Sequence, residues 1–170
     1  MSINFELKFS PWRMDDLDNL VKYANNKKIA DNLTDAFPHP YTIEEGIKFI
    51  TKCANENPTH VFAIRINDKA IGSIGIFPQN DIHAKNAEMG YWLAEEFWGM
   101  GIVTKAIKQT ITYGFKTFDI NRIFARPFGT NLASQRVLEK AGMNLEARFD
   151  KTIFKNGKFF DEMIYAIKKM

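Results

Sequence analysis

The amino-acid sequence predicts an α+β fold, a mixed α/β sandwich in which strands and helices follow one another around a mixed sheet. Three observations support this class. A strand, a glycine-bearing turn and a long helix follow in order over residues 88–118. Two hairpin signals, at 67–69 and at Asn156-Gly157, each separate two β-rich runs. Several other segments have the apolar spacing of amphipathic helices.

In the first half of the chain, a strand is expected over 5–9, where apolar and polar residues alternate, and Pro11 ends it. A helix follows, and a shorter helical piece is expected near 28–33. Segment 35–41 contains two prolines and is therefore an aromatic loop, of the kind that often walls a pocket. Thr42, with Glu45 three residues on, forms a capping box that opens the next helix. The apolar residues expected to face the core from these two longer helices are Leu17, Leu20, Val21 and Ala24, then Ile43, Ile47, Ile50 and Ala54.

In the second half, strands are expected at 61–66 and 70–77, then at 88–94 after a polar connection. A long helix begins at Ile102, and a fifth strand over 122–126 ends at Pro127. Asn131 caps a further helix that Gly142 stops, and two closing strands meet at a type I′ turn. The buried stripe of the long helix comprises Ile102, Val103, Ala106, Ile107, Thr110, Ile111, Gly114, Phe115 and Phe118.

Composition narrows the class of protein. The chain has 170 residues, of which 45% are apolar and 25% charged, so a single globular domain over 1–170 is expected. The net charge of +3, with dispersed cations, predicts neither a nucleic-acid nor a membrane partner. No apolar run is long enough to span a membrane, and the N-terminus lacks the pattern of a signal peptide. With Cys53 as the single cysteine, no internal disulfide forms, and a reducing cytoplasm is the expected location.

Gly99 and Gly101 stand between a strand and a helix N-terminus. The first-turn amides of a helix lack intrahelical partners and carry partial positive charge, so this turn is a candidate anion site. It is neither a Walker loop nor GxGxxG, because Thr104 stands where a third glycine would fall. A bare GxG pattern is common in ordinary turns, and a general nucleotide-phosphate binder stays open as an alternative.

Four sequence segments in the right order resemble the GCN5-related N-acetyltransferase (GNAT) superfamily. They are FPHPYT, AEMGYWLAEEFWGMG, NLASQRVLEKAGM and NGKFFDEMIYAI, and they span nearly the whole chain. The likeness is greatest to the branch that acetylates N-terminal alanine or serine of ribosomal proteins. The resemblance implies a GNAT-like sheet of six to seven strands, mixed and mostly antiparallel, with helices on both faces. It also implies a V-shaped splay between the fourth and fifth strands.

The resemblance further implies acetyl-CoA as co-substrate. Backbone amides of the glycine turn would hold the pyrophosphate, main-chain groups near Leu93 would pair with the pantetheine arm, and Asn131 would bond that arm. Two departures stand out: Glu96 replaces the family's Gln or Arg, and Leu138 occupies the position of the family's tyrosine acid. The expected cofactor-binding residues are Trp92, Leu93, Trp98, Gly99, Met100, Gly101, Ile102, Val103, Thr104, Asn131 and Ser134.

Two residues are candidates for catalysis. Glu88 would remove a proton from the acceptor amine, against the alternative of a salt-bridged strand-end carboxylate. Ser134 would protonate the leaving thiolate, against the alternative of a first-turn serine that bonds only backbone. The acceptor pocket is expected at Phe37, His39 and Tyr41 of the aromatic loop. The three histidines show no metal-ligand spacing, so no metal is expected.

The predicted function is acetyl-CoA-dependent transfer of an acetyl group to a primary amine, either a protein N-terminus or a small amine, by direct attack in a ternary complex. The alternative is a catalytically weak CoA-binding module that serves as a sensor or scaffold. A homodimer is the default expectation for the assembly.

Overall fold

The computed structural model describes residues 6–170, and it contains one seven-stranded sheet in the order β1-β2-β3-β4-β5-β7-β6. The β4–β5 pair is parallel, and the pairs β1–β2, β2–β3, β5–β7 and β6–β7 are antiparallel. The predicted mixed, mostly antiparallel sheet is therefore confirmed. The strands are β1 (Leu7–Pro11), β2 (Val61–Ile66), β3 (Lys69–Pro78), β4 (Asn86–Leu93), β5 (Arg122–Ala125), β6 (Asn144–Lys155) and β7 (Lys158–Lys168).

Five α-helices and three short 3₁₀ turns connect the strands of the described chain. Within residues 6–170, no helix has both the length and the apolar character needed to cross a membrane. The helices are α1 (Leu17–Ala24), α2 (Lys27–Ala30), α3 (Ile43–Ala54), α4 (Ile102–Thr117) and α5 (Leu132–Lys140), and the 3₁₀ turns are η1 (Met14–Asp16), η2 (Asp81–His83) and η3 (Glu95–Phe97). Of the first predicted strand, Phe5 lies outside the described residues, and β1 runs two residues further than expected, to Pro11.

The parallel pairing of β4 with β5 is short. It joins Asn86–Glu88 to Arg122–Phe124, whereas β4 itself continues to Leu93. The fourth strand thus runs on beyond its pairing with the fifth, as the predicted splay requires.

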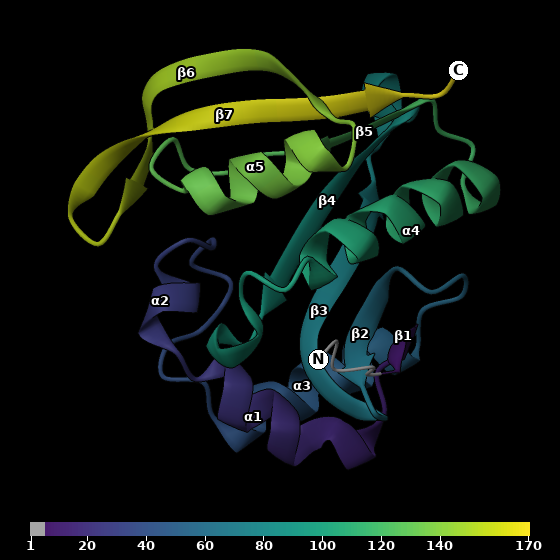
Figure 1. Ribbon diagram of the computed structural model, residues 1–170, viewed down its shortest axis with the longest axis vertical. Helices are drawn as coiled ribbons and strands as arrows, with labels where there is room; N and C mark the ends of the chain where they lie inside the picture. The colour runs from purple at the N-terminus through teal and green to yellow at the C-terminus, as the bar shows by residue number, and fades with distance from the viewer. Residues whose placement is uncertain (1–5) are drawn as a thin grey trace. The chain divides into compact units, whose positions relative to one another are not determined.

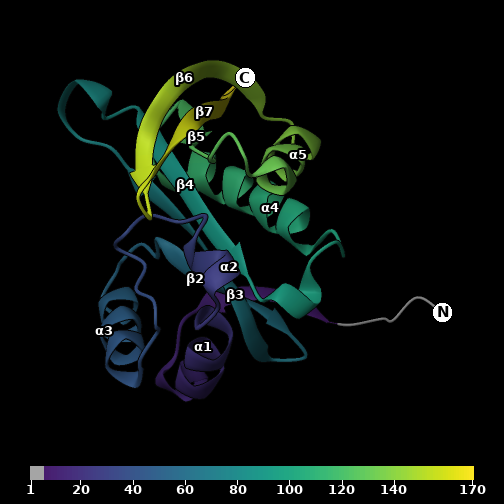
Figure 2. The same ribbon diagram turned by 90° about the vertical axis from the view of Figure 1, so that its left-hand side faces the viewer.

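The chain divides into two compact units, each described by itself. One comprises the residues up to Gly75 together with Tyr91–Ile102. Its core gathers aromatic and aliphatic side chains around Trp12, Ile50 and Trp92. Helices α1 and α3 lie side by side against this core (Figure 2).

The buried face of α3 differs from the predicted one. Ile43 and Ile47 are 60% and 42% exposed, and Gly46, Ile50 and Cys53 face the core instead. A β-carbon at Gly46 would lie only 2.7 Å from the Leu17 side chain of α1. Because α1 approaches at the glycine, the helix turns its isoleucines at 43 and 47 to solvent. The predicted stripe was therefore wrong at these two positions and at Ala54, which is also exposed.

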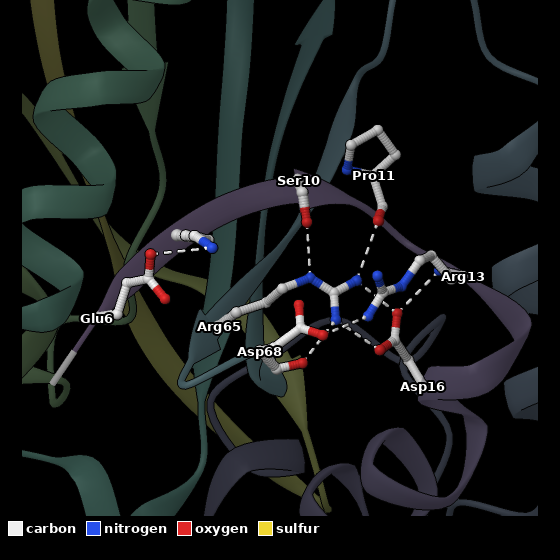
Figure 3. Close-up of polar contacts among 8 residues, drawn as sticks. Glu6, Ser10, Pro11, Arg13, Asp16, Arg65 and Asp68 are labelled. Carbon is white, nitrogen blue, oxygen red and sulfur yellow. Dashed lines mark hydrogen bonds and ion pairs between the residues drawn. The ribbon is translucent and has the colours of Figure 1, made fainter.

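A buried ion pair lies at the edge of this unit (Figure 3). The guanidinium of Arg65, 1% exposed, donates to both carboxylate oxygens of Asp16 at 2.6 and 2.7 Å. Arg65 also donates to the Ser10 hydroxyl at 2.6 Å and to the carbonyls of Pro11 and Asp68. This network ties β1, η1 and the β2–β3 turn together.

The other unit comprises Ile76–Gly90 and Val103–Met170. The predicted stripe of α4 is confirmed at its centre, where all five predicted residues are buried, while three others at its ends are only partly buried. The buried residues are Ala106, Ile107, Thr110, Ile111 and Gly114, and the partly buried ones are Val103, Phe115 and Phe118. The β6–β7 hairpin lies beside α5 (Figure 1), and the hydroxyl of Tyr165 on β7 donates to Glu139 of α5 at 3.0 Å. At the hairpin turn, Asn156 and Gly157 have φ values of +51° and +75°, which confirms the predicted type I′ turn.

Candidate functional site

The turn that follows β4 has the backbone conformation that its two glycines allow. Gly99 and Gly101 have φ values of +76° and +74°, in the left-handed region that side chains with a β-carbon disfavour. No atom lies within 4 Å of a β-carbon built on either glycine, so backbone conformation and not crowding requires them. Helix α4 begins directly afterwards at Ile102, and its first-turn amides have no partner within the helix. The segment can therefore present several N–H donors to an anion.

Side chains from α1 and α2 hold the η3 turn that precedes these glycines. The Glu95 carboxylate accepts a hydrogen bond of 2.9 Å from Asn26 Nδ2 and forms an ion pair with Lys28. These contacts, led by the hydrogen bond from Lys28, lower the pKa of the Glu95 carboxyl below its ordinary value of 4.5. The Phe97 ring meets the ring of Tyr23 edge-on, with centroids 6.2 Å apart. The start of the turn is thus fixed to the N-terminal helices.

Glu96, the residue that departs from the family pattern, is exposed and engages Tyr23. Burial, then the hydrogen bond with Glu96 and its charge, raise the pKa of the Tyr23 hydroxyl. The hydrogen bond with Tyr23 of α1 fixes where the Glu96 carboxylate lies, but it leaves the negative charge in place, because the tyrosine is neutral.

Trp98 folds back onto the strand before it. Its indole N–H donates to the Leu93 carbonyl at 2.8 Å, although the side chain is 46% exposed. Behind Leu93, Gly72 of β3 permits a close approach, since a β-carbon there would lie 2.5 Å from the Trp92 carbonyl oxygen. The end of β4 is therefore positioned by the Trp98 side chain and by the close approach of β3.

The aromatic loop 35–41 supplies the expected acceptor residues. Phe37 packs edge-on against Trp92 with centroids 6.1 Å apart, and its centroid lies 5.3 Å from that of Tyr41. Tyr41 is buried in the core, and burial, followed by the charge of Glu45, raises its pKa to about 12. His39, in contrast, is exposed. Phe37 thus connects the loop to β4 through Trp92.

Glu88 is held in an ion pair where the pairing of β4 and β5 ends. Nε of Arg126 donates to Oε1 of Glu88 at 3.0 Å, and a terminal nitrogen donates to Oε2 at 3.3 Å. The guanidinium also lies 3.6 Å from Glu162 on β7. Burial lowers the pKa of Arg126, but the hydrogen bond and charge of Glu88, with the charge of Glu162, outweigh it and raise the pKa overall.

Asn131 and Ser134 come together at the start of α5. The Asn131 side-chain oxygen accepts a hydrogen bond of 3.2 Å from the Ser134 amide, which confirms the predicted cap. Ser134 is half-buried. Leu138, at the position of the family's tyrosine, is fully buried and belongs to the core. Among residues 6–170, no three His, Cys, Asp or Glu side chains are grouped so as to hold a metal ion.

Comparison with known proteins identifies the family. The acetyltransferase (GNAT) domain matches residues 6–144, which is most of the chain. This chain belongs to the GNAT acetyltransferase family. The predicted resemblance is therefore confirmed, and with it the enzyme class that the family model names.

Individual relatives of this GNAT protein include other acetyltransferases. YoaA of Bacillus subtilis, an N-acetyltransferase, is 33% identical over 105 residues, and the ribosomal-protein-serine acetyltransferase of Escherichia coli is 30% identical over 106 residues. Each alignment covers 62% of this chain and 59% of the relative, so the chain spans less than two thirds of both proteins. Among solved structures, the microcin C7 self-immunity acetyltransferase MccE, in complex with acetyl-CoA and AMP, has a TM-score of 0.81 and 26% identity. That match covers 99% of this chain and 96% of the MccE chain.

Sequence reasoning did not identify the partners that the structure gives to the candidate site residues. Arg126, which pairs with Glu88, and Glu162, which lies beside Arg126, were not among the candidates. The only signal was the position of Arg126 as the last residue of a predicted strand, and it does not reveal which carboxylate the arginine meets. Asn26 and Lys28, which anchor η3, are likewise about 70 residues away in sequence from Glu95.

Proposed function

We propose that this chain is an acetyl-CoA-dependent N-acetyltransferase that moves an acetyl group to a primary amine by direct attack. One observation carries the proposal. Within a chain of the GNAT family, Gly99 and Gly101 both adopt the left-handed conformation immediately before α4. That arrangement supplies free first-turn amides for a pyrophosphate, with open space above the glycines.

For the co-substrate, backbone amides between Trp98 and Thr104 would hold the pyrophosphate of acetyl-CoA. The end of β4 at Trp92 and Leu93 would bond the pantetheine arm as an added strand does. The cap uses the oxygen of Asn131, so its amide nitrogen is the group that would donate to this arm. MccE supports this choice of co-substrate, since its structure contains acetyl-CoA.

The reaction needs a proton removed from the amine and one delivered to sulfur. In our proposal the Glu88 carboxylate takes a proton from the acceptor's ammonium. The neutral nitrogen then attacks the thioester carbon, forming the C–N bond, and the tetrahedral intermediate collapses with cleavage of the C–S bond. Ser134 donates a proton to the thiolate and recovers one from the nitrogen. The products are the amide and free CoA, with one proton returned to solvent from Glu88.

The acceptor would lie against Phe37 and His39, with the buried Tyr41 supporting Phe37 from the core. Relatives act on two kinds of primary amine: ribosomal-protein serine and spermidine, both in Escherichia coli. We therefore propose a protein N-terminus or a small amine as acceptor. A homodimer is part of the proposal, and light scattering on the purified chain tests it.

The experiment is a free-thiol assay with acetyl-CoA and a panel of amines that includes serine- and alanine-initiated peptides and spermidine. We expect turnover with at least one amine, and a fall in kcat of about 10²-fold in Glu88→Gln and in Ser134→Ala, the lower end for a lost acid or base. Binding of acetyl-CoA, measured by calorimetry, stays unchanged in Glu88→Gln and weakens by no more than about fivefold in Ser134→Ala, the equivalent of one ordinary hydrogen bond to the cofactor. Glu146→Gln is the matched control, because Glu146, like Glu88, pairs with an arginine, here Arg122 of β5, but is no candidate.

The outcomes separate the alternatives. Tight binding of acetyl-CoA without thiol release from any amine would indicate a sensor or scaffold. Competition by ATP or NAD at similar affinity would indicate a general nucleotide-phosphate binder. Turnover that is equal in wild type and both variants would remove Glu88 and Ser134 from the mechanism.

A further inference from the structure

Three charged side chains meet directly after β5: the guanidinium of Arg126 and the carboxylates of Glu88 on β4 and Glu162 on β7. Its guanidinium bonds Glu88 of β4 at 3.0 and 3.3 Å and lies 3.6 Å from Oε1 of Glu162 on β7. The Glu162 side chain is 19% exposed and that of Glu88 30%, whereas Arg126 is 47% exposed. The two carboxylates are therefore more enclosed than the cation that joins them.

The charges of this cluster do not cancel. Two carboxylates and one guanidinium leave one negative charge, and the further neighbour of Glu162 is the uncharged hydroxyl of Thr152 at 3.5 Å. Four residues earlier on β5, Arg122 forms a one-to-one pair with Glu146 at 2.6 Å, whose charges do cancel. β5 and the residue that directly follows it thus supply the cations of a balanced pair and of an acidic cluster.

The guanidinium of Arg126 has two carboxylate partners, Glu88 and Glu162. With its fork on Glu88 it fixes the plane of that carboxylate, because a bidentate pair restricts rotation. An ion pair that is partly open to water adds little net free energy, since water competes for both charges. A second cation of similar hydrogen-bonding capacity can therefore take the place of Arg126 on Glu88, while Glu162 retains the guanidinium.

We propose that Arg126 is a positioning residue for Glu88 and that the acceptor's ammonium group displaces it. This inference rests on the proposed function, in which Glu88 takes the proton. Before the acceptor binds, Arg126 holds the carboxylate in place. When the ammonium arrives, it bonds Glu88, neutralises the surplus negative charge, and leaves Arg126 on Glu162. The cluster thereby selects acceptors whose reacting nitrogen is itself the cation.

The test separates binding of the acceptor from turnover. In Arg126→Gln the cluster carries two negative charges and has lost its fork, so we expect the acceptor KM to fall about fivefold, the effect of one unit charge near 4 Å in water. We expect kcat to fall in the same variant, because Glu88 is no longer oriented, and the acetyl-CoA KM to stay constant. Arg126→Lys keeps the charge without the fork, so its acceptor KM stays at the wild-type value while kcat falls.

Arg122→Gln is the matched control, since it breaks an Arg–Glu pair whose arginine lies four residues earlier in the chain, and it should leave the acceptor KM unchanged. Glu162→Gln supplies a second, opposite change. It makes the cluster neutral, so the acceptor KM should rise. This variant keeps the inference testable if Arg126→Gln does not fold, which circular dichroism would reveal.

An acceptor KM that rises or stays constant in a folded Arg126→Gln would overturn the inference, as would a constant acceptor KM in Glu162→Gln. If wild type turns over an amine and the variants give either of these results, the inference fails but the proposed function stands. If wild type releases no thiol with any amine, the proposed function fails, and the inference fails with it.

Discussion

The indole nitrogen of Trp98 donates a 2.8 Å hydrogen bond to the carbonyl oxygen of Leu93, five residues earlier. This bond links the end of β4 to the residue that directly precedes Gly99, and it thereby fixes the position of the glycine turn relative to the strand. Because both residues belong to the proposed acetyl-CoA site, loss of this bond should change the binding of acetyl-CoA, which can be measured.

Trp98→Phe keeps an aromatic ring but removes the donor. We expect the acetyl-CoA KM to rise about fivefold, the equivalent of one ordinary hydrogen bond of about 1 kcal/mol, with little change in kcat. Trp12→Phe is the control, because its indole also donates, to the Ser73 hydroxyl at 3.2 Å, but from the core. It should lower the melting temperature without affecting the acetyl-CoA KM. An unchanged KM in Trp98→Phe would show that the bond does not position the turn.

Two glycines with the same backbone conformation distinguish binding from stability. Gly99 and Gly157 have φ values of +76° and +75°, and no atom lies within 4 Å of a β-carbon at either. Replacement of either by alanine should cost about 1 kcal/mol of unfolding free energy, measured by urea denaturation. Only Gly99→Ala should weaken acetyl-CoA binding, measured by calorimetry, because Gly157 lies in the β6–β7 turn. Equal binding by both variants would contradict an anion site at the first turn.

Gly72 controls how closely β3 approaches the end of β4. A β-carbon there would lie 2.5 Å from the Trp92 carbonyl oxygen and 3.0 Å from Leu93 Cα, and backbone atoms cannot rotate away. Gly72→Ala should therefore cost about 1–3 kcal/mol of unfolding free energy, and its acetyl-CoA KM should rise as Leu93 moves. Gly90→Ala is the control within β4, since its nearest atom would be Phe77 Cε2 at 3.9 Å. A Gly72→Ala protein with wild-type stability and KM would contradict this account.

The Arg65–Asp16 pair should dominate the stability of the N-terminal edge. Both side chains are at most 4% exposed, so removal of one leaves the other buried without its partner. Arg65→Met should cost about 3–5 kcal/mol of unfolding free energy in urea denaturation. Asp119→Asn, which breaks an exposed pair with Lys85, should change it by less than about 1 kcal/mol. Recovery of stability in the double variant Arg65→Met/Asp16→Leu would confirm that the cost lies in the unpaired charge.

Periodicity explains which parts of the fold the sequence could predict. The stripe of α4 is buried as its spacing indicates, and Asn156-Gly157 forms the turn its residue types favour. These features depend on neighbours within a few residues. The buried face of α3 depends on a distant segment, because the approach of α1 at Gly46 decides which side is buried. Leu17, the residue of α1 nearest to Gly46, lies 29 positions away in the sequence.

The chemistry divides in the same way. By itself, the sequence determined the strand–turn–helix order, the two glycines, the Asn131 cap and the family resemblance, because each is written in local residue types. Only the tertiary structure decided that Glu88 meets Arg126 across 38 residues, that Arg65 is buried with Asp16, and that Glu96 meets Tyr23. Which charged side chains form pairs depends on which of them the fold brings close together. The strand pairing that does so has no signature in the residues themselves.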